Sequence, residues 1–426
     1  MEELLHYVWK HRLFPLKRLE TTDGCPLEVI DPGLPNPHAG PDFFNAKVKI
    51  GGVVWAGPVE IHLRASDWAR HGHPANPAYD SVILHVASDI DATVCRTDGS
   101  PIPQLELHYP PYLQQNYEEL LQTARYPACY RLIPRLPRLT LHSWLTSLQL
   151  ERFEAKTRQI EEWLQANGQD WEQAFFLSLA RSFGFGVNSD LYERWARTLP
   201  LAAVNKHRDD LFQIEALFFG QAGLLQQDPP ADDYQARLGK EYDYLKHKFG
   251  LPPSPEGHWS FLRMRPGNFP TVRIAQLAAL YHRSQGLLSQ LMEADTLQQL
   301  RRLLTGEASV YWTTHYLFGE PSVPRPKRLS QSSADLLIIN TVVPFLYAYG
   351  KRRGDERLCL RTSRLLEELK PENNTVTRMW SECGLTAAHA ADSQALLQLK
   401  KNYCDPKKCL FCRIGYEYFK ADPATY

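Results

Sequence analysis

The spacing of hydrophobic residues predicts a mixed α/β region at the start of the chain. Apolar residues at positions 4, 5, 8 and 9 predict a short amphipathic helix over 2–10. Alternating apolar and polar residues then predict strands over 26–30, 46–50, 53–63 and 82–87, and a weaker strand over 104–108. Gly51 and Gly52 separate the second and third strands, which is typical of a tight hairpin. The stretch SDWAR predicts one helical turn before the fourth strand.

Beyond residue 130 the apolar spacing becomes helical. The longest amphipathic runs lie over 141–167, 171–183, 189–198, 209–225, 233–249, 272–292, 297–304, 334–352 and 356–369, with breaks at Pro and Gly clusters. No repeat of fixed period occurs, so the pattern does not support a solenoid. We therefore predict an α+β/α fold class, with an α/β domain over 1–130 and a helical domain over 131–426.

Composition indicates an ordinary globular protein. The chain has 426 residues, of which 43% are hydrophobic and 23% charged, and its length suggests two or three domains. The apolar stretch 336–346 is interrupted by Asn340 and Pro344 and is too short for a membrane span. The N-terminal MEELLHYVWKHRLFP lacks the apolar core and cleavage site of a secretory signal. We therefore expect a cytoplasmic protein without a membrane partner.

Charge is divided unevenly along a chain whose formal net charge is zero. Residues 1–130 hold 10 Lys and Arg against 16 Asp and Glu, which leaves 38 against 32 for the remainder. The first part also contains 8 of the 15 histidines. This division suits an acidic, metal-loaded catalytic part beside a basic part that holds the substrate. Chance fluctuation on a neutral protein explains it equally well.

The candidate metal site is formed by Asp42, Glu60 and His62. Strand side chains alternate, so Glu60 and His62 point to the same face. Counting from the hairpin turn places Asp42 about nine residues before Gly51 and Glu60 about eight after Gly52, at one level of the sheet. Carboxylates favour Mg²⁺, and an adjacent imidazole extends the choice to Mn²⁺ or Zn²⁺. The open alternative is a buried ion network.

Further polar residues near this site are weaker candidates. Glu28 lies on the first predicted strand, His71 and His73 lie in the loop HGHPANP, and His85 lies on the fourth strand. A surface or packing role is the ordinary expectation for each of them taken alone. A metal bound here would lower the pKa of a water molecule and neutralise charge on a phosphoryl oxygen.

This pattern resembles the PD-(D/E)XK nuclease superfamily. Pro41-Asp42 is followed 18 positions later by Glu60-Ile61-His62, and the predicted order of helix, three strands, helix and strand matches the restriction-endonuclease-like core. The resemblance covers about the first 90 residues and implies a metal-dependent nuclease. His62 stands where the superfamily has lysine, and an imidazole is a less constant cation at pH 7. The resemblance therefore implies the fold more firmly than the activity.

The whole chain also resembles an uncharacterised bacterial protein family. The segments that carry this resemblance are NPHAGPDFFNAKVKIGG, WAGPVEIHLRASDW, HGHPANPAYDSVILHV, RPGNFPTVRIAQLA and YCDPKKCLFCRIG. They are spread over almost the full length. The family brings no established activity to the chain.

A second candidate metal site lies near the C-terminus. Cys404, Cys409 and Cys412 follow the spacing C-x4-C-x2-C, and basic neighbours favour their thiolates. Cys383 or His389 would supply a fourth ligand to Zn²⁺. An iron–sulfur cluster held by four cysteines is the less favoured alternative, and the absence of any metal also remains open.

A basic and aromatic segment, FLRMRPGNFPTVR, is the candidate nucleic-acid site. It combines Arg263, Arg265 and Arg273 with aromatic residues ahead of a predicted helix start, a combination that binds phosphates and stacks on bases. A structural turn is the open alternative. From the sequence we expect a metal-dependent phosphodiester hydrolase acting on DNA or RNA. The alternative is a non-catalytic protein that binds nucleic acid or protein on a nuclease-like scaffold.

Overall fold

The chain forms two compact units. The computed structural model describes residues 1–421. Unit 1 comprises Met1–Leu141, Cys383–Leu385 and Lys400–Tyr426, and unit 2 comprises His142–Glu382 and Thr386–Leu399. A mixed β-sheet within residues 19–106 precedes a largely helical region, which confirms the predicted fold class. The segment from Lys400 onward, which we predicted within the helical domain, belongs to unit 1.

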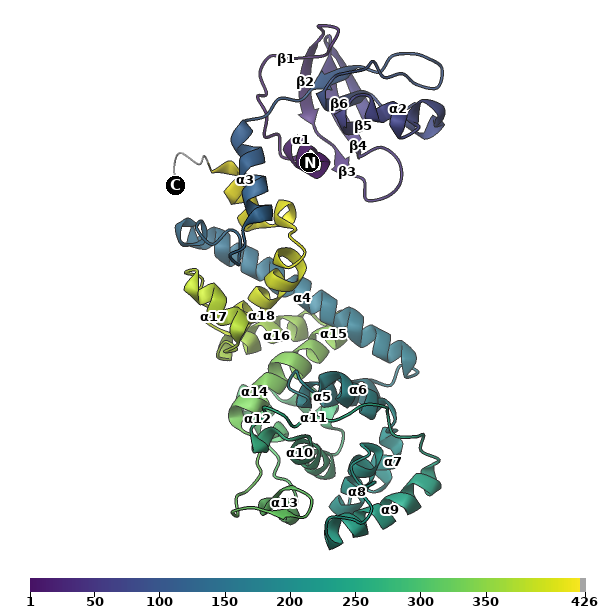
Figure 1. Ribbon diagram of the computed structural model, residues 1–426, viewed down its shortest axis with the longest axis vertical. Coiled ribbons are helices and arrows are strands. Elements are labelled where there is room, and N and C mark those ends of the chain that lie inside the picture. Colours follow the sequence, from purple (N-terminus) through teal and green to yellow (C-terminus); the bar gives the residue numbers. More distant parts are fainter. Residues whose placement is uncertain (422–426) are drawn as a thin grey trace. The chain divides into compact units, whose positions relative to one another are not determined.

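A mixed sheet forms the centre of the N-terminal region (Figure 1). Its strands run in the order β1-β2-β4-β5-β6-β7, with β3 paired to β4. β2, β4 and β5 are antiparallel neighbours, whereas β5, β6 and β7 are parallel. The strands span Leu19–Glu20 (β1), Pro26–Asp31 (β2), Leu34–Pro35 (β3), Phe43–Ile50 (β4), Val53–Arg64 (β5), Leu84–Asp89 (β6) and Gln104–Glu106 (β7). All five predicted strands are therefore present.

The predicted hairpin joins β4 to β5. Ile50 pairs with Val53, and Gly51 and Gly52 take φ values of 56° and 91° between them. These left-handed conformations suit glycine, which has no Cβ to clash with the backbone. The hairpin fixes the register on which the candidate site depends.

Two helices contact strand β5 in unit 1. Helix α1 (Glu2–Lys10) has the predicted bounds and buries Leu4, Leu5 and Val8, and the single turn α2 (Asp67–Arg70) buries Trp68. Residues 59–62 of β5 are all buried, as in strands that are covered on both faces. The part of β5 nearest the hairpin turn is exposed instead. Polar residues in the covered part of β5 are therefore held inside the protein.

The C-terminal segment completes unit 1. Helix α19 (Arg413–Lys420) contacts α3 (Pro111–Gln122), and Asn116 donates hydrogen bonds to the carbonyls of Tyr418 and Ala421 over 3.2 and 3.1 Å. Figure 1 shows α3 beside the yellow C-terminal helices. The shorter elements of the unit are η1 (His73–Ala75), η2 (Pro77–Tyr79), η3 (Ile133–Arg135), the π-helical turn η6 (Lys400–Cys404) and η7 (Cys409–Phe411).

Unit 2 is helical apart from one short β-pair. Its helices are α4 (Arg138–Ala166, which begins in unit 1), α5 (Trp171–Phe183), α6 (Ser189–Arg197), α7 (Leu201–Lys206), α8 (Leu211–Gln221), α9 (Asp233–Phe249), α10 (Pro270–Arg283), α11 (Leu287–Glu293), α12 (Leu297–Leu304), α13 (Val310–Thr313), α14 (Gln331–Leu337), α15 (Val343–Arg353), α16 (Glu356–Glu368), α17 (Thr375–Glu382) and α18 (Ala390–Leu399), with a π-helical turn η5 (Ile338–Val342), a 3-10 turn η4 (Pro266–Asn268) and strands β8 (His315–Leu317) and β9 (Glu320–Pro321). The run predicted over 272–292 is two helices, because Gly286 adopts a φ of 66° between them.

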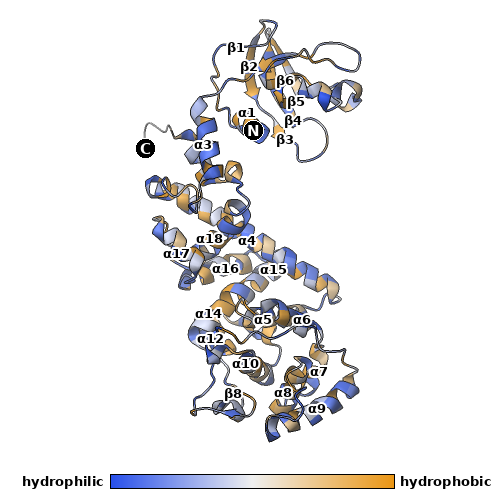
Figure 2. Ribbon diagram, viewed as in Figure 1, coloured by the Kyte–Doolittle hydropathy of each residue, from blue (hydrophilic) through white to orange (hydrophobic). Residues whose placement is uncertain are grey.

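The core of unit 2 is formed around helices that are buried on most sides. Residues 270–281 of α10 are all buried, and aromatic rings of Phe176, Trp195, Phe218 and Tyr281 pack together beside it. Figure 2 shows hydrophobic residues along α5, which contributes Phe176. Such burial differs from the amphipathic pattern that we predicted over 171–183 and 272–292, because a helix inside the core has no solvent-facing side.

One helical stretch is long and apolar enough to cross a membrane by length and composition alone. It runs over Gln331–Arg353, from α14 through η5 to α15, and 72% of its apolar window is buried inside the protein. The core helix of a globular unit has the same properties. The stretch contributes Leu337, Val343 and Phe345 to the core of unit 2.

The buried carboxyl group of Glu215 makes the stability of unit 2 depend on pH. Burial raises the pKa of Glu215 to about 7 although the hydroxyl of Tyr234 donates to it. Because this pKa is raised in the folded state, protonated Glu215 contributes to the free energy of unfolding. This contribution is complete below the ordinary pKa of about 4.5 and is lost as the pH rises through about 7. Between pH 4.5 and 8, ionisation of Glu215 should lower the free energy of unfolding, measured with urea, by on the order of 3 kcal/mol. We expect this fall to be absent in Glu215→Gln. An unchanged pH dependence in the variant would contradict this.

Candidate metal centre

A β-bulge in strand β4 places Asp42 opposite Glu60. From the hairpin turn the strands pair regularly as far as Ala46 and Gly57, but Phe43 then pairs with Val59. One additional residue of β4 is therefore accommodated between these pairs. Extending the register by one residue sets Asp42 opposite Glu60. Without the bulge, Asp42 would face Ile61 instead.

Asn45 provides the bulge conformation. Its φ of 57° lies in the left-handed region, where asparagine is tolerated better than other residues with a side chain. Its neighbour Ala46 is buried and returns to the regular pairing. Asp42 lies nine residues before Gly51 and Glu60 lies eight after Gly52, a difference of one residue. The extra residue in the bulge accounts for this difference.

Two hydrogen bonds to backbone amides fix the carboxylates of Asp42 and Glu60. The amide of Asp42 donates to Oε2 of Glu60 over 3.0 Å, and the amide of Ile61 donates to Oδ2 of Asp42 over 2.9 Å. Each carboxylate therefore accepts from the backbone of the opposite strand, which fixes both side chains. Oε1 of Glu60 remains directed toward the histidines.

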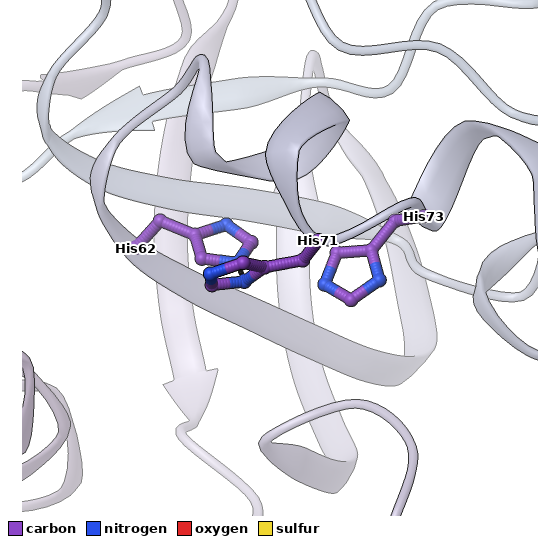
Figure 3. Close-up of side chains that lie close together, drawn as sticks. All are labelled: His62, His71 and His73. Carbon is purple, nitrogen blue, oxygen red and sulfur yellow. Dashed lines mark hydrogen bonds between the residues drawn. The ribbon is translucent and has the colours of Figure 1, made fainter.

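Four histidines gather beside Glu60. His62 and His85 lie on β5 and β6, His71 follows α2, and His73 begins η1. Nδ1 of His62 is 2.9 Å from Nε2 of His85, and Nε2 of His62 is 3.2 Å from Nδ1 of His71. Figure 3 shows the rings of His62, His71 and His73 close together. The parallel pairing of Glu60 with His85 brings β6 into the same cluster.

The nitrogen and carboxylate atoms are spaced as ligands of a metal ion. One ring nitrogen from each of His62, His71 and His73 lies within 4.8 Å of the others. Oε1 of Glu60 is 3.2 Å from Nε2 of His73 and 3.6 Å from Nε2 of His62. Three imidazoles and one carboxylate are a donor set used by Zn²⁺, Mn²⁺ and iron. Mg²⁺, which prefers oxygen ligands, fits this set less well.

Several buried nitrogens of this cluster lack a hydrogen-bond partner. They are Nδ1 of His85 and both ring nitrogens of His73. The contact of His73 with Glu60 is short, but its geometry is not that of a hydrogen bond. A buried polar atom without a partner costs about 1–3 kcal/mol. A bound ligand would remove that cost. These nitrogens without a hydrogen-bond partner therefore favour a metal or an ordered water in the cluster.

Burial favours the uncharged form of His62, His85 and His73. Burial, together with the neighbouring imidazoles, lowers the pKa of His62 to about 3. Burial also lowers the pKa of His85 to about 4 and shifts that of His73 downward. The neutral imidazole is the form that binds metal ions. Burial and the nearby charge of Asp42 raise the pKa of Glu60 to about 8, so a cation beside it would favour its ionised form.

The cluster reaches solvent at the edge formed by Asp42 and His71. Glu60, His62 and His73 are buried, whereas His71 is exposed. The side chain of Asp42 is 25% exposed and that of His6 30%, and Nε2 of His6 lies 3.3 Å from Oδ2 of Asp42. Burial lowers the pKa of His6, but the contacts with Asp42 outweigh it and the net shift is upward. A substrate would therefore meet Asp42, His6 and His71 first.

The structure brings the three predicted site residues together and adds others that the sequence reasoning missed. His6 was not considered, because no local motif links helix α1 to the sheet. His71, His73 and His85 were only weak candidates, although HGH followed by a strand histidine is the signal that would have found them. Glu28 is exposed on β2 and pairs with Lys49, away from the histidines.

The three predicted arginines do not form one surface. Arg263 and Arg265 are exposed, but Arg273 is only 6% exposed within α10. Its guanidinium donates to Gln276 over 2.9 Å and lies 4.4 Å from the centre of the Phe185 ring. Burial lowers the pKa of Arg273 to about 10. Its position is that of a core arginine, so only Arg263 and Arg265 of the three are exposed.

The predicted cysteine ligands lie in unit 1. Cys383 belongs to its short segment Cys383–Leu385, and Cys404, Cys409 and Cys412 lie in the C-terminal segment. His389, the alternative fourth ligand, lies in unit 2, where its Nδ1 is 3.7 Å from Asp392. Burial raises the pKa of a further thiol, that of Cys129, and the thiols of Cys412, Cys404 and Cys409 raise it further.

These features define a protein with a mixed sheet, a large helical unit and a histidine-rich candidate metal centre. The chain belongs to the family described as "Protein of unknown function (DUF2851)", whose model matches residues 2–375. Comparison with curated proteins and with solved structures found no match. The candidate centre lies entirely within the matched region.

We expect His62→Ala and His73→Ala to weaken Zn²⁺ or Mn²⁺ binding at least about 10-fold, because each removes a nitrogen donor. Isothermal titration of metal-free protein measures the affinity, and the metal-dependent rise in melting temperature provides a second readout. His108→Ala is the matched control, since this histidine of the same unit has a side chain that is 76% exposed. Equal affinities in all variants would exclude the site.

We expect Asn45→Val to destabilise unit 1 by about 1–2 kcal/mol and to weaken metal binding, because valine disfavours the left-handed conformation of the bulge. Asn45→Gly should retain both properties. Lys47→Val, on an exposed position of the same strand, serves as the control in urea unfolding and in metal titration. Wild-type stability and wild-type metal affinity in Asn45→Val would mean that the bulge does not position Asp42.

Proposed function

We propose that the protein is a metal-dependent phosphodiester hydrolase, a nuclease, that acts on nucleic acid. The observation that carries this proposal is the convergence of Asp42, Glu60 and His62 with His71 and His73 at an edge open to solvent. A divalent cation held there would supply an activated water molecule and would neutralise charge on a phosphoryl oxygen. The cytoplasmic location expected from the sequence is part of the same proposal.

The arrangement of the N-terminal elements supports a PD-(D/E)XK-type nuclease. α1, the strands β2, β4 and β5, the turn α2 and strand β6 follow one another in the order of the restriction-endonuclease-like core. Asp42 stands just before β4, and Glu60-Ile61-His62 lies within β5, as the resemblance implies. His62 in place of lysine is compatible with this proposal if the donor set favours Mn²⁺ or Zn²⁺ over Mg²⁺.

Some residues of the centre would bind the metal ion, and another would transfer protons. Glu60, His62 and His73 are buried and would hold the metal, while Asp42 would act as a further ligand from the open side. His6 is partly exposed beside Asp42, so it would accept a proton from the attacking water or donate one to the leaving oxygen. Arg263 and Arg265 are exposed cations of unit 2 that would contact phosphates.

A second candidate function is non-catalytic binding of nucleic acid or protein on the same scaffold. The observation that favours it is the absence of lysine at position 62, where the resembled superfamily carries its cation. The Asp42–Glu60 pair would then be part of a structural network. The two functions differ in one result, because the second gives binding without cleavage.

Cleavage assays test the proposed function. We expect the protein to cleave labelled DNA or RNA with Mn²⁺, and with Mg²⁺ more slowly. Asp42→Ala and Glu60→Ala should each reduce the rate at least about 100-fold, as removal of a group that stabilises the transition state does. Glu28→Ala changes an exposed carboxylate of the same sheet and is the matched control. Binding without cleavage by the wild type favours the second function, and metal binding unaffected by Asp42→Ala and Glu60→Ala contradicts the first.

A further inference from the structure

The imidazole ring of His62 has different neighbours at its two nitrogens. Nε2 lies 3.2 Å from Nδ1 of His71, as Figure 3 shows, and 3.6 Å from Oε1 of Glu60. Nδ1 lies 2.9 Å from Nε2 of His85. The two nitrogens of one imidazole point in divergent directions. His71 and Glu60 therefore meet one side of the His62 ring, and His85 meets another.

The contacts on the Nε2 side of His62 have the spacing of metal ligands. Bonds of about 2.0–2.1 Å to a tetrahedral zinc ion place neighbouring ligand atoms about 3.3 Å apart. Nε2 of His62 is 3.2 Å from Nδ1 of His71, which is close to that value. Oε1 of Glu60 is likewise 3.2 Å from Nε2 of His73. His62 would therefore bind a metal ion through Nε2.

His85 lies on the other side of the His62 ring and outside this ligand set. The residues whose ligand atoms lie within 4.8 Å of one another are His62, His71 and His73. Two ring nitrogens 2.9 Å apart share one hydrogen atom, since one donates and the other accepts. When Nε2 of His62 binds a cation, the hydrogen of this ring is on Nδ1. Nδ1 then donates, and Nε2 of His85 accepts.

Aromatic packing holds both rings in this orientation. Trp68, His62 and His85 are all buried. The Trp68 ring packs edge to face against those of His62 and His85, at centroid distances of 6.4 and 5.6 Å. The indole nitrogen of Trp68 donates to the carbonyl of Cys95 over 3.1 Å, which fixes the indole in turn. Neither histidine ring can rotate freely away from the other.

The parallel pairing of β5 with β6 sets the contact between the two histidines. Glu60 of β5 pairs with His85 of β6. Residues that pair directly point to the same face of a sheet, and residues two apart in one strand also share a face. The side chains of Glu60, His62 and His85 therefore project from one face. A slip of one residue in β6 would turn His85 to the opposite face.

We propose that His85 is a positioning residue of the metal centre. Its Nε2 accepts the hydrogen on Nδ1 of His62 when Nε2 of His62 binds the ion, and this hydrogen bond orients the His62 ring. His85 is not itself a ligand. Metal-bound histidines usually have such an outer partner, most often a carboxylate, a carbonyl or a water molecule. The inference rests on the metal ion of the proposed function but does not require cleavage of nucleic acid.

Metal binding would place the hydrogens of both rings on Nδ1. In His85 this nitrogen is buried and has no hydrogen-bond partner among residues 1–421. A buried N–H without an acceptor costs less free energy than a coordinated zinc ion contributes, so the ion would impose this tautomer. In the opposite tautomer of His62, Nε2 would donate to His71 and would be lost as a ligand. The tautomers of His62 and His85 thus report the proposed role directly.

Metal titration of the full chain tests the role of His85. We expect His85→Phe, which keeps a ring without an acceptor, to bind Zn²⁺ about 10–100-fold more weakly than the wild type. His85→Gln should stay within about threefold of the wild type, because its carbonyl oxygen can accept the same hydrogen. Val86→Ala is the matched control. This buried neighbour points to the opposite face of β6, so the change reduces packing without removing an acceptor.

Two spectra distinguish a positioning residue from a ligand and from a residue with only a packing role. Co²⁺ at saturation should give the same visible absorbance spectrum in the wild type and in His85→Phe, because the ligands are unchanged. In the Zn²⁺-bound wild type, nitrogen NMR of isotope-labelled histidine should show the hydrogen on Nδ1 in both His62 and His85.

Each outcome decides the inference. Equal Zn²⁺ affinity in His85→Phe, an equally large loss in His85→Gln or Val86→Ala, a changed Co²⁺ spectrum, or a hydrogen on Nε2 of His85 in the Zn²⁺ form overturns it. A wild type that binds no Zn²⁺ overturns it together with the metal site. Zinc binding that depends on His85 without any cleavage overturns the nuclease alone. If His85→Phe fails to fold by circular dichroism, the NMR spectrum of the wild type decides.

Discussion

The hydrogen bonds that the carboxylates of Asp42 and Glu60 accept from backbone amides determine where the other groups of the candidate centre can lie. Each carboxylate accepts a backbone amide of the opposite strand, so neither side chain can turn away without leaving a buried donor unpaired. The bulge at Asn45 makes this arrangement possible. Oε1 of Glu60 is thereby held beside His62 and His73, and Oδ2 of Asp42 beside His6.

The centre combines a buried inner part with an exposed edge. Burial keeps His62 and His85 neutral, which suits metal ligands but leaves no permanent cation inside the cluster. Asp42, His6 and His71 connect this inner part to solvent. The proposed nuclease activity would need both parts, because a metal would have to be fixed while a phosphodiester and the attacking water would have to enter.

The division of the chain into units explains why the C-terminal segment packs against helix α1. The C-terminal segment returns to unit 1, where α19 packs on α3 and Phe419 packs on Tyr7. Unit 2 is inserted between the sheet and this segment along the chain, apart from the short piece Cys383–Leu385. Aromatic rings pack together in its core of α5, α8 and α10. The guanidinium of Arg273 lies over the ring of Phe185.

Local patterns in the sequence determined the secondary structure and the hairpin, because strand alternation, helical spacing and the Gly51-Gly52 turn act over a few residues. They also brought Asp42 to the level of Glu60, with a remaining mismatch of one residue. The bulge that removes this mismatch and the addition of His6 were decided only by the tertiary structure. These contacts join segments that lie far apart in the chain, and nothing in the spacing of nearby residues encodes them.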